Sequence, residues 1–263
     1  MTAIIITSDL WKGVNIRSHT NIKHAFTEWL TLPEVALDPE KIMIIAGNIA
    51  FNRTEQTISF FKTLSGILNE HSIKGLTALW VRGNRDYWIK PQQSFFEMIK
   101  KSDKDIMNTR GTNFIHLTGD KPYISRSGIL IAGFDGWYSR LEPTNPDLYR
   151  LPAKIENMKA HEYLYKKTQM DFTKCLMNLN AIPHDANIRH RIMVSHFPYE
   201  PTVLDKENPG YLCTHEHLEE MKKNIDAWVF GHTQKYCHKE VDGITYLNAG
   251  YTIDNPHAII LKL

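Results

Sequence analysis

Five residues with metal-binding side chains each follow a short apolar run of the sequence. In chain order they are Asp9, Asn48, Asn84, His196 and His232. Carboxylate and amide oxygens together with imidazole nitrogens are the ligands that hold Zn, Mn or Fe in proteins. A single Asn or Asp after a strand is commonly a turn former, and a single His commonly satisfies a local hydrogen bond. Because five such residues stand in equivalent places, they predict a metal-binding cleft.

The apolar runs before these residues are typical of buried strands. Each run is short, apolar on both faces and bounded by turn residues, as in a sheet that is covered on both sides. Segments with helical periodicity lie between the runs. Their apolar faces comprise Ile22, Phe26 and Trp29, then Ile58, Phe61, Leu64 and Leu68, and finally Phe172, Leu176 and Leu179. Alternating strands and helices indicate an α/β fold, in which ligands bind beyond the carboxyl ends of the strands.

The C-terminal part of the chain has a different pattern. Residues 236–241 and 244–248 flank the dipeptide Asp242-Gly243, which predicts a β-hairpin. Residues 257–263 predict a last strand, and together with the hairpin they suggest a second sheet packed on the first. A further helical segment is predicted at about 152–180. The sequence has no low-complexity stretch, linker or repeat, so we expect residues 1–263 to form a single domain.

The composition restricts the class of protein. The chain has 263 residues, of which 42% are hydrophobic, and this suffices for a sizeable core. Its net charge of +2 gives no electrostatic reason to expect a nucleic acid or an anionic membrane, although nucleic acid stays an open alternative. The chain starts without a basic leader, and no apolar run reaches the roughly 20 residues needed to span a bilayer. Three widely spaced cysteines favour free thiols, so we expect a cytoplasmic protein.

In their order, the five residues resemble the signature of the calcineurin-like metallophosphoesterases. That signature consists of Asp-x-His, Gly-Asp, Gly-Asn-His-Asp/Glu, a later His and Gly-His-x-His. The resemblance extends from Asp9 to His232, and residues 83–88 and 133–138 resemble two elements of bacterial members. It implies an α/β fold with two mixed β-sheets packed as a sandwich and flanked by helices. It also implies metal-dependent hydrolysis of a phosphomonoester, phosphodiester or pyrophosphate, with a phosphorylated small molecule or nucleotide as substrate.

The resemblance assigns the five residues to two metal positions. Asp9 matches a ligand of the first metal, whereas Asn84, His196 and His232 match ligands of the second. Asn48 stands where the family has the Asp that bridges the two metals. An amide binds a dication much more weakly than a carboxylate in a partly dry site. The pattern therefore implies one divalent ion (Mn, Fe, Zn or Mg) rather than two.

Three further positions depart from the signature. Trp11 replaces a His and offers only an indole N–H, which has no lone pair for a metal. Gln234 replaces another His and is a weak, neutral ligand. Arg85 replaces a third His; it cannot donate a proton at neutral pH, but it can clamp phosphate bidentately. We assign Arg85 and the adjacent Asp86 to the catalytic set, and we expect activity that is weak or absent.

Two functions fit this pattern. The chain is either a metallophosphoesterase whose ligands have changed, naturally or by design, or a non-catalytic relative. The second kind of protein would bind a phosphorylated ligand or assemble with a protein partner. Metal content separates the two, because an active enzyme should purify with close to two metals and a pseudoenzyme with one or none.

Two other groups of residues carry weaker signals. A structural zinc site is one alternative, although the spacing matches none of the usual ligand pairs; its candidates are Cys213, His215, His217, Cys237 and His238. Residues 211–217 could instead form a loop over the cleft that selects the substrate. Four aromatic residues beside the motifs could stack on a base or sugar, or could belong to the core. They are Trp80, Trp88, Trp137 and Tyr138.

Overall fold

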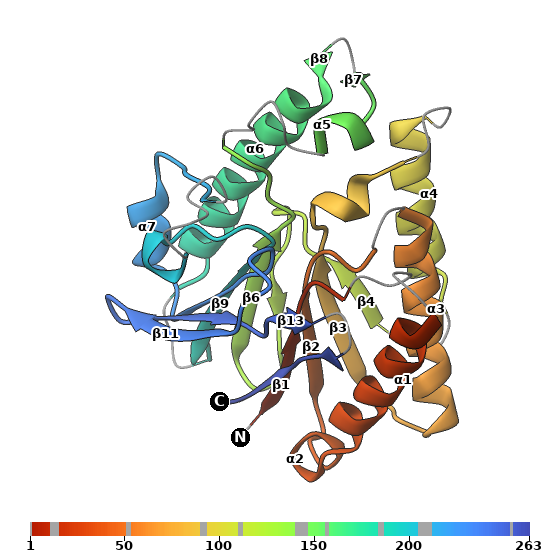
Figure 1. Cartoon of the computed structure of the whole chain (residues 1–263). Helices are drawn as coiled ribbons and strands as arrows, with labels where there is room; N and C mark the ends of the chain where they lie inside the picture. Colours follow the sequence, from red (N-terminus) through yellow and green to blue (C-terminus); the bar gives the residue numbers. More distant parts are fainter. Residues whose placement is uncertain are drawn as a thin grey trace.

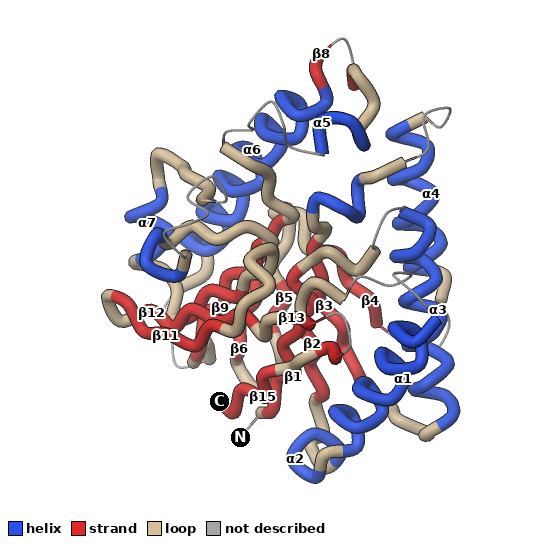
Figure 2. The backbone as a smooth tube through the Cα atoms, in the orientation of Figure 1, coloured by secondary structure: helices blue, strands red, loops and turns tan. Residues whose placement is uncertain are grey.

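The computed structural model describes residues 2–10, 16–50, 54–89, 94–109, 113–139, 147–155, 158–183, 187–204, 212–252 and 255–263. Two β-sheets pack face to face at its centre, and helices cover their outer faces (Figure 1). Figure 2 shows the strands gathered between two groups of helices. This arrangement confirms the predicted α/β fold with two mixed sheets.

The first sheet has five strands in the order β15-β1-β2-β3-β4. Strands β1 to β4 run parallel to one another, whereas β15 is antiparallel to β1. Their bounds are β1 Ala3–Thr7, β2 Lys41–Ala46, β3 Leu76–Val81, β4 Asn113–His116 and β15 Ile259–Lys262. Side chains alternate between the two faces, as a strand requires. Ile5 packs toward the helices, while Ile4 and Ile6 pack toward the second sheet.

The second sheet has six strands in the order β11-β12-β10-β9-β6-β5. The four inner strands are parallel, and the two outer strands are antiparallel to their neighbours. Their bounds are β5 Tyr123–Ile124, β6 Ile129–Phe134, β9 His190–Ser195, β10 Ala227–Val229, β11 Cys237–Val241 and β12 Ile244–Asn248. The predicted hairpin is β11–β12. Its turn holds Asp242 and Gly243 at φ 51° and 79°, the left-handed values that a two-residue hairpin turn needs.

The prediction that the last strand joins the second sheet is wrong. β15 pairs with β1 in the first sheet, with Ile260 opposite Ile5. Thr2 and Leu263 extend this pairing through two backbone hydrogen bonds of 2.7 and 3.0 Å. Without β15, β1 would form an unpaired sheet edge beside a buried core, which leaves backbone groups unsatisfied. The apolar pattern of a strand does not reveal such a partner at the other end of the chain.

Helices α1, α3 and α4 pack on the first sheet, and α6 and α7 pack on the second (Figure 1). The bounds are α1 Ile16–Thr31, α2 Pro33–Ala36, α3 Thr54–Glu70, α4 Phe95–Met107, α5 Asp147–Arg150, α6 Ala160–Ala181 and α7 Leu218–Lys222. The three helix faces predicted to be apolar are all buried. Within the described ranges, no helix combines the length and the apolar character needed to cross a membrane.

The helical segment predicted at about 152–180 begins later than expected. α6 starts at Ala160, and the strand pair β7 (Lys154–Ile155) and β8 (Met158–Lys159) precedes it. Ile155 is buried in the core beside the second sheet, so packing outweighs helical propensity there. The other short elements are the 3₁₀ turns η1 Asn84–Tyr87 and η2 Pro201–Val203 and the strand pair β13 Tyr251–Thr252 with β14 Asn255–Pro256.

Candidate functional site

The carboxyl ends of five strands meet at one edge of the sandwich and bring the five predicted ligands together. These strands are β1, β2, β3, β9 and β10. Asn48 Nδ2 donates to Asp9 Oδ1 (3.0 Å), and the His232 N–H donates to Asp9 Oδ2 (2.9 Å). His196 Nε2 lies 3.1 Å from Asn84 Oδ1 and 3.3 Å from His232 Nδ1. All five side chains are buried, so their interactions are little screened by water.

The loops that follow these strands have unusual backbone geometry. Asp9, Asn48 and His232 have φ values of 53°, 53° and 65°, in the left-handed region that non-glycine residues rarely adopt. A Cβ added at Gly83 would lie 2.3 Å from Asn48 Oδ1 and 2.4 Å from Asn48 N. The chain after β3 therefore approaches the chain after β2 more closely than a side chain would allow. Strained backbone of this kind clusters at functional sites.

The Asp9–Asn48 pair does not fit a cation. The backbone N–H of Arg85 donates to Asn48 Oδ1 (3.0 Å), so the NH₂ group of Asn48 faces Asp9. Each oxygen of Asp9 thus accepts an N–H, one from Asn48 and one from His232. Burial raises the pKa of Asp9 to about 7, so a proton also competes for this carboxyl group at neutral pH. Two carboxylates here would need a cation between them, whereas the Asn–Asp pair does not.

Three atoms converge at the second metal position. They are Asn84 Oδ1, His196 Nε2 and His232 Nδ1, and together we name them the cradle. The carbonyl oxygen of Ala46 lies 2.8 Å from His196 Nδ1; because a carbonyl only accepts, the proton is on Nδ1 and a lone pair is on Nε2. Burial lowers the pKa of His196 to about 4 and that of His232 well below its usual value. Both rings are therefore neutral and able to bind a metal.

The cradle fits one divalent cation. Ligand bonds of about 2.1 Å place neighbouring ligand atoms roughly 3.0–3.4 Å apart, and the distances in the cradle are 3.1 and 3.3 Å. His232 Nδ1 adds a third lone pair in one tautomer and donates to His196 in the other. Among the described residues, no group of three or more His, Cys, Asp or Glu side chains could hold a metal. Binding in the cradle therefore depends on the amide of Asn84.

Arg85, the first predicted catalytic residue, places a positive charge beside the cradle. Its guanidinium Cζ lies 4.9 Å from the centroid of the Trp88 ring. Burial lowers the pKa of Arg85, while the charges of Asp147 and Asp9 oppose this shift. The charge of Arg85 in turn contributes to the lowered pKa values of both cradle histidines. This position suits a side chain that binds phosphate oxygens.

Asp86, the second predicted catalytic residue, holds two loops together. Its carboxylate accepts hydrogen bonds from the N–H groups of Ile49 (3.2 Å), Ala50 (2.7 Å) and Gly83 (2.9 Å) and from the Thr57 hydroxyl (2.9 Å). Burial raises the pKa of Asp86, and the donors oppose the rise. With four donors on two oxygens, Asp86 joins the loop after β2 to the loop after β3. These contacts give Asp86 a structural role, and its catalytic role stays a prediction.

Of the two other departures from the signature, only Gln234 lies in the described part of the chain. Trp11 falls outside the described residues. Gln234 is exposed and has φ 58°, so its amide does not take part in the contacts among the five buried residues. Of the residues assigned to the first metal position, only Asp9 and Asn48 are therefore found in the described cleft.

The zinc alternative is wrong for the described residues, which contain no suitable group of ligands. The buried thiol of Cys213 donates to the carbonyl of Trp137 (2.9 Å). The ring of His215 stacks on Phe172, with centroids 4.0 Å apart. The rest of the predicted loop, residues 212–217, lies against Ser139, whose hydroxyl accepts the N–H of Thr214 (2.8 Å). These residues pack on the second sheet, and the three cysteines of the chain are free thiols.

The four aromatic residues beside the motifs serve packing and hydrogen bonding. Trp80 and Trp137 are each 1% exposed and belong to the core, which excludes stacking on a ligand. Trp88 Nε1 and the Tyr138 hydroxyl donate to Asp147 at 2.8 and 2.7 Å. Both of these rings are also buried.

Sequence reasoning missed three polar residues near the cleft. Asp135 follows β6, and its carbonyl accepts the N–H of His196 (3.1 Å). Asn248 ends β12 and accepts from the Ser8 hydroxyl (2.9 Å). Both follow or end an apolar run, so the rule that found the five ligands could have found them. Asp147 on α5 has no such signal in the sequence.

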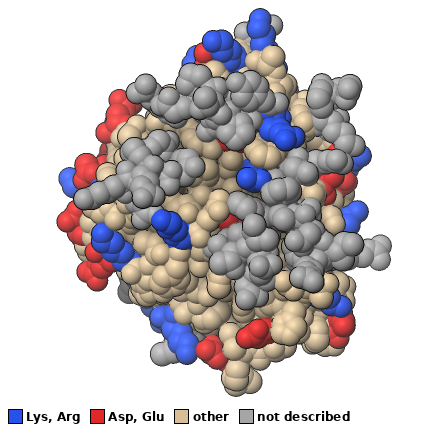
Figure 3. All heavy atoms as spheres, in the orientation of Figure 1, with Lys and Arg blue, Asp and Glu red and all other residues tan. Residues whose placement is uncertain are grey.

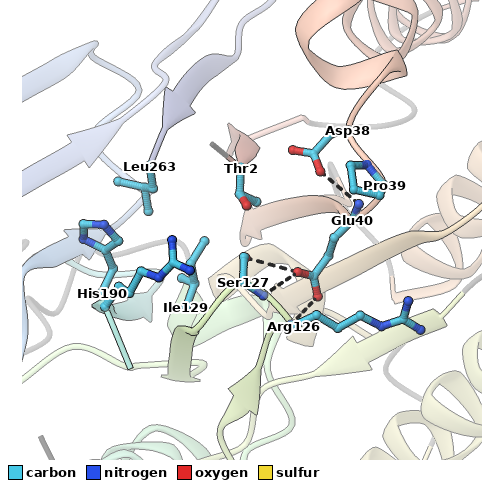
Figure 4. Close-up of a pocket in the computed structure, with 10 residues that line it drawn as sticks. Thr2, Asp38, Pro39, Glu40, Arg126, Ser127, Ile129, His190 and Leu263 are labelled. Carbon is cyan, nitrogen blue, oxygen red and sulfur yellow. Dashed lines mark hydrogen bonds between the residues drawn. The ribbon is translucent and has the colours of Figure 1, made fainter. Parts of the chain in front are cut away.

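A separate cavity of about 410 Å³ lies at the opposite, amino ends of the strands (Figure 4). The carboxylate of Glu40 accepts from the N–H groups of Arg126 (2.7 Å) and Ser127 (3.0 Å). Asp38 accepts from the N–H of Ala3 (2.8 Å). The Glu40 bonds tie the start of the first sheet to the β5–β6 turn of the second, whereas the Asp38 bond holds the segment before β2 to the start of β1. The carboxylate of Glu40 therefore joins the two sheets at this cavity.

Solved structures share this architecture. A phosphopantetheinyl hydrolase from Mycobacterium tuberculosis matches with a TM-score of 0.64 at 13% identity, over 96% of this chain and 90% of that one. A putative 5′-nucleotidase from Staphylococcus aureus matches with a TM-score of 0.57 at 10% identity, over 98% of this chain and 53% of that one. GAP50, the anchor in the inner membrane complex of Plasmodium, matches with a TM-score of 0.58 at 12% identity, over 95% and 71%. The chain has the metallophosphoesterase fold.

At these sequence identities, the structural similarity establishes the fold alone. Any chemistry must be inferred from the residues of the cleft. No protein-family model and no curated protein sequence matches the chain. The metallophosphoesterase fold agrees with the architecture that the sequence motifs imply.

Proposed function

We propose that this chain is a metal-dependent phosphoester hydrolase that holds one divalent cation in the cradle and works at a low rate. One observation carries the proposal: His196 Nε2 and Asn84 Oδ1, which both bear lone pairs, face each other at 3.1 Å. Two buried acceptors in contact are unfavourable unless a donor or a cation lies between them. Neutral His196 supplies no proton at Nε2. A proton on His232 Nδ1 would satisfy Nε2 alone, whereas a cation would satisfy both atoms.

The cradle and Arg85 would have separate roles in the proposed hydrolysis. A cation in the cradle would supply Lewis-acid charge that polarises a phosphoryl oxygen. Arg85 would bind phosphate oxygens bidentately, because its guanidinium lies against Trp88 beside the cradle. His196 keeps its orientation through the hydrogen bond from Nδ1 to Ala46. The Asp9–Asn48 pair offers no place for a second cation, and we expect a low rate for this reason.

A phosphorylated small molecule or nucleotide is the substrate class that we propose. The hydrolase and the putative nucleotidase that share the fold are named for substrates of this class. Figure 3 shows Lys and Arg interspersed with Asp and Glu on the face drawn, and the net charge is +2. Interspersed charge favours a small ligand over an extended polyanion.

The Asp9–Asn48 pair favours a second candidate function, binding without catalysis. Both oxygens of Asp9 accept N–H groups, so this half of the cleft is complete without a metal. The Plasmodium protein is named as an anchor, so its role differs from that of the two named hydrolases. On this interpretation, the chain would bind a phosphorylated ligand or a protein partner and would turn over nothing.

The proposed hydrolase holds one cation, so metal content alone does not separate the two functions, and turnover is measured with it. Purified protein would be analysed for Zn, Mn and Fe, and Mn²⁺-dependent hydrolysis of bis(p-nitrophenyl) phosphate would be measured. The hydrolase predicts one equivalent of metal and slow turnover, both lost in Asn84→Leu and both kept in Asn180→Leu, which changes an exposed amide. If the unmodified protein contains no metal and shows no turnover, the hydrolase proposal is overturned and binding without catalysis is supported.

A further inference from the structure

Helix α5 contributes a buried carboxyl group, Asp147, to the side of the cleft. The side chain of Asn84 lies against it, with Nδ2 3.1 and 3.0 Å from its two oxygens. Trp88 Nε1 donates to Oδ1 (2.8 Å), and the Tyr138 hydroxyl donates to Oδ2 (2.7 Å). Asp147 is 1% exposed, so these bonds form away from water and their geometry is tightly defined.

The contact with Asp147 decides the orientation of the Asn84 amide. A carboxylate only accepts hydrogen bonds, so the Asn84 atom that faces it is the NH₂ nitrogen. The amide is planar, and its oxygen therefore points the other way, where His196 Nε2 lies 3.1 Å away. The flipped amide would place its oxygen against the carboxylate and its NH₂ group in the cradle. That orientation would both create a repulsion and remove a ligand atom.

We propose that Asp147 is a positioning residue that fixes the Asn84 amide so that its oxygen, and not its nitrogen, lines the cradle. This inference rests on the proposed function and deepens it, since it makes a residue of α5 control the affinity of the cradle. Trp88 and Tyr138 hold the carboxylate of Asp147 in turn. Partners that orient a metal ligand in this way typically change metal affinity by about 10–100-fold when they are removed.

Asp147 could act through its negative charge instead, and the variant Asp147→Asn distinguishes the two roles. An Asn at this position can keep its oxygen toward Asn84 and Trp88, and Asn84 Nδ2 then keeps one of its two contacts with residue 147. Its NH₂ group can donate to the Tyr138 hydroxyl, which turns to accept. The orientation of Asn84 then survives although the charge is lost. Asp147→Leu removes the charge and the acceptor together.

The experiment measures two properties of the full chain in each variant. Calorimetric titration gives the affinity for Mn²⁺, and nitrogen-15 NMR of the metal-free protein reports the environment of the Asn84 side-chain amide. Asp147→Leu should bind Mn²⁺ about 10–100-fold more weakly, whereas Asp147→Asn should stay within about threefold of the unmodified protein. Asp38→Leu is the control, because it removes another buried acceptor, at the opposite end of the sandwich. It should lower stability and leave the affinity unchanged.

Two results would overturn the inference. One is an unchanged Asn84 amide signal in Asp147→Leu. The other is an affinity loss in Asp147→Asn of about tenfold or more, which would assign the effect to charge. Should Asp147→Leu fail to fold, the Asp147→Asn result alone decides. Unmodified protein that binds no Mn²⁺ would refute the proposed function, while the metal-free amide signal would still test how Asp147 positions Asn84.

Discussion

Asn48 differs from an aspartate only in one NH₂ group, and that group reverses the electrostatics of the cleft. It turns a contact between two buried carboxylates into a hydrogen bond of 3.0 Å to Asp9. The Arg85 N–H fixes the orientation of the amide from the other side. Two neighbouring carboxylates that share a buried site favour either a proton or a cation between them. At the scale of single residues, one NH₂ group therefore decides whether Asp9 faces a hydrogen-bond donor or a second carboxylate.

Asn48→Asp should make the stability of the protein depend on Mn²⁺. Without metal, repulsion from Asp9 and the lost hydrogen bond should lower the free energy of unfolding by about 1–3 kcal/mol. With Mn²⁺ a cation between the carboxylates should recover this loss. Thermal denaturation with and without Mn²⁺ checks the prediction. Asn48→Leu should lose stability without recovery, and equal responses of the Asp and Leu variants would contradict the assignment of this position.

Asp86→Ala should destabilise the fold because it removes the acceptor of four buried donors. Leaving these donors unpaired should lower the free energy of unfolding by at least about 3 kcal/mol. Thr57→Val removes only one of the four and should cost about 1 kcal/mol. Urea denaturation of both variants provides the measurement. A well-folded Asp86→Ala protein of unchanged stability that has lost turnover would instead support the catalytic role predicted for Asp86.

At the scale of elements, the cleft depends on strand ends that approach at backbone distance. The chain after β3 touches the chain after β2 at Gly83, where a side chain has no room. Because parallel strands end on the same edge, each loop can present one buried polar residue there. The cleft is therefore built by short loops whose spacing the sheet sets.

Gly83→Ala should disrupt this edge far more than a glycine substitution elsewhere. Its new Cβ would meet Asn48 at 2.3 Å, so the loops would have to separate. We expect a loss of roughly 3 kcal/mol or more, or failure to fold. Gly66→Ala, within α3, meets nothing within 4 Å and should gain about 0.5–1 kcal/mol. Similar unfolding midpoints for the two variants would show that the loops are less constrained than this spacing implies.

Much of the fold could be predicted from the sequence, because strands buried on both faces need continuous apolar runs. Asp9 and His196 could be predicted as well, since each directly follows such a run. Asp147 could not, because it meets Asn84 only through tertiary packing across 63 positions of the chain. The orientation of the Asn84 amide likewise depends on that remote contact. Sequence patterns give the type of a ligand, whereas its hydrogen-bonding state depends on its neighbours.

At the scale of the whole molecule, one buried carboxylate links the two sheets beneath the cleft. Asp135, after β6, accepts the N–H of Arg82 (2.7 Å), after β3. His116 Nε2 of β4 lies 2.6 Å from the same carboxylate, and Lys167 of α6 lies 3.9 Å from it. Burial alone would raise the pKa of Asp135, but these charges hold it well below its ordinary value of 3.8.

The lowered pKa of Asp135 should make the protein sensitive to acid. A carboxyl group with a lower pKa in the folded state stabilises the fold above its unfolded pKa and loses this contribution as the pH falls below it. Asp135→Asn should be less stable at neutral pH, and its stability should change less between about pH 5 and pH 2. The midpoints of urea denaturation, measured for both proteins across this pH range, check the prediction. Asp120→Asn should change the profile little, because Asp120 is 64% exposed and screened by water.

The pairing of β15 with β1 has a consequence for how the chain is made. The Thr7 hydroxyl donates to the carbonyl of His257, 250 residues further along, and the two strands pair over four residues. Contacts so distant in sequence form slowly, and a ribosome delivers the first strand long before the last. During synthesis, one edge of β1 therefore stays open to other strands. We expect completion of the first sheet to be a late step of folding, and the protein should be most prone to aggregate before it.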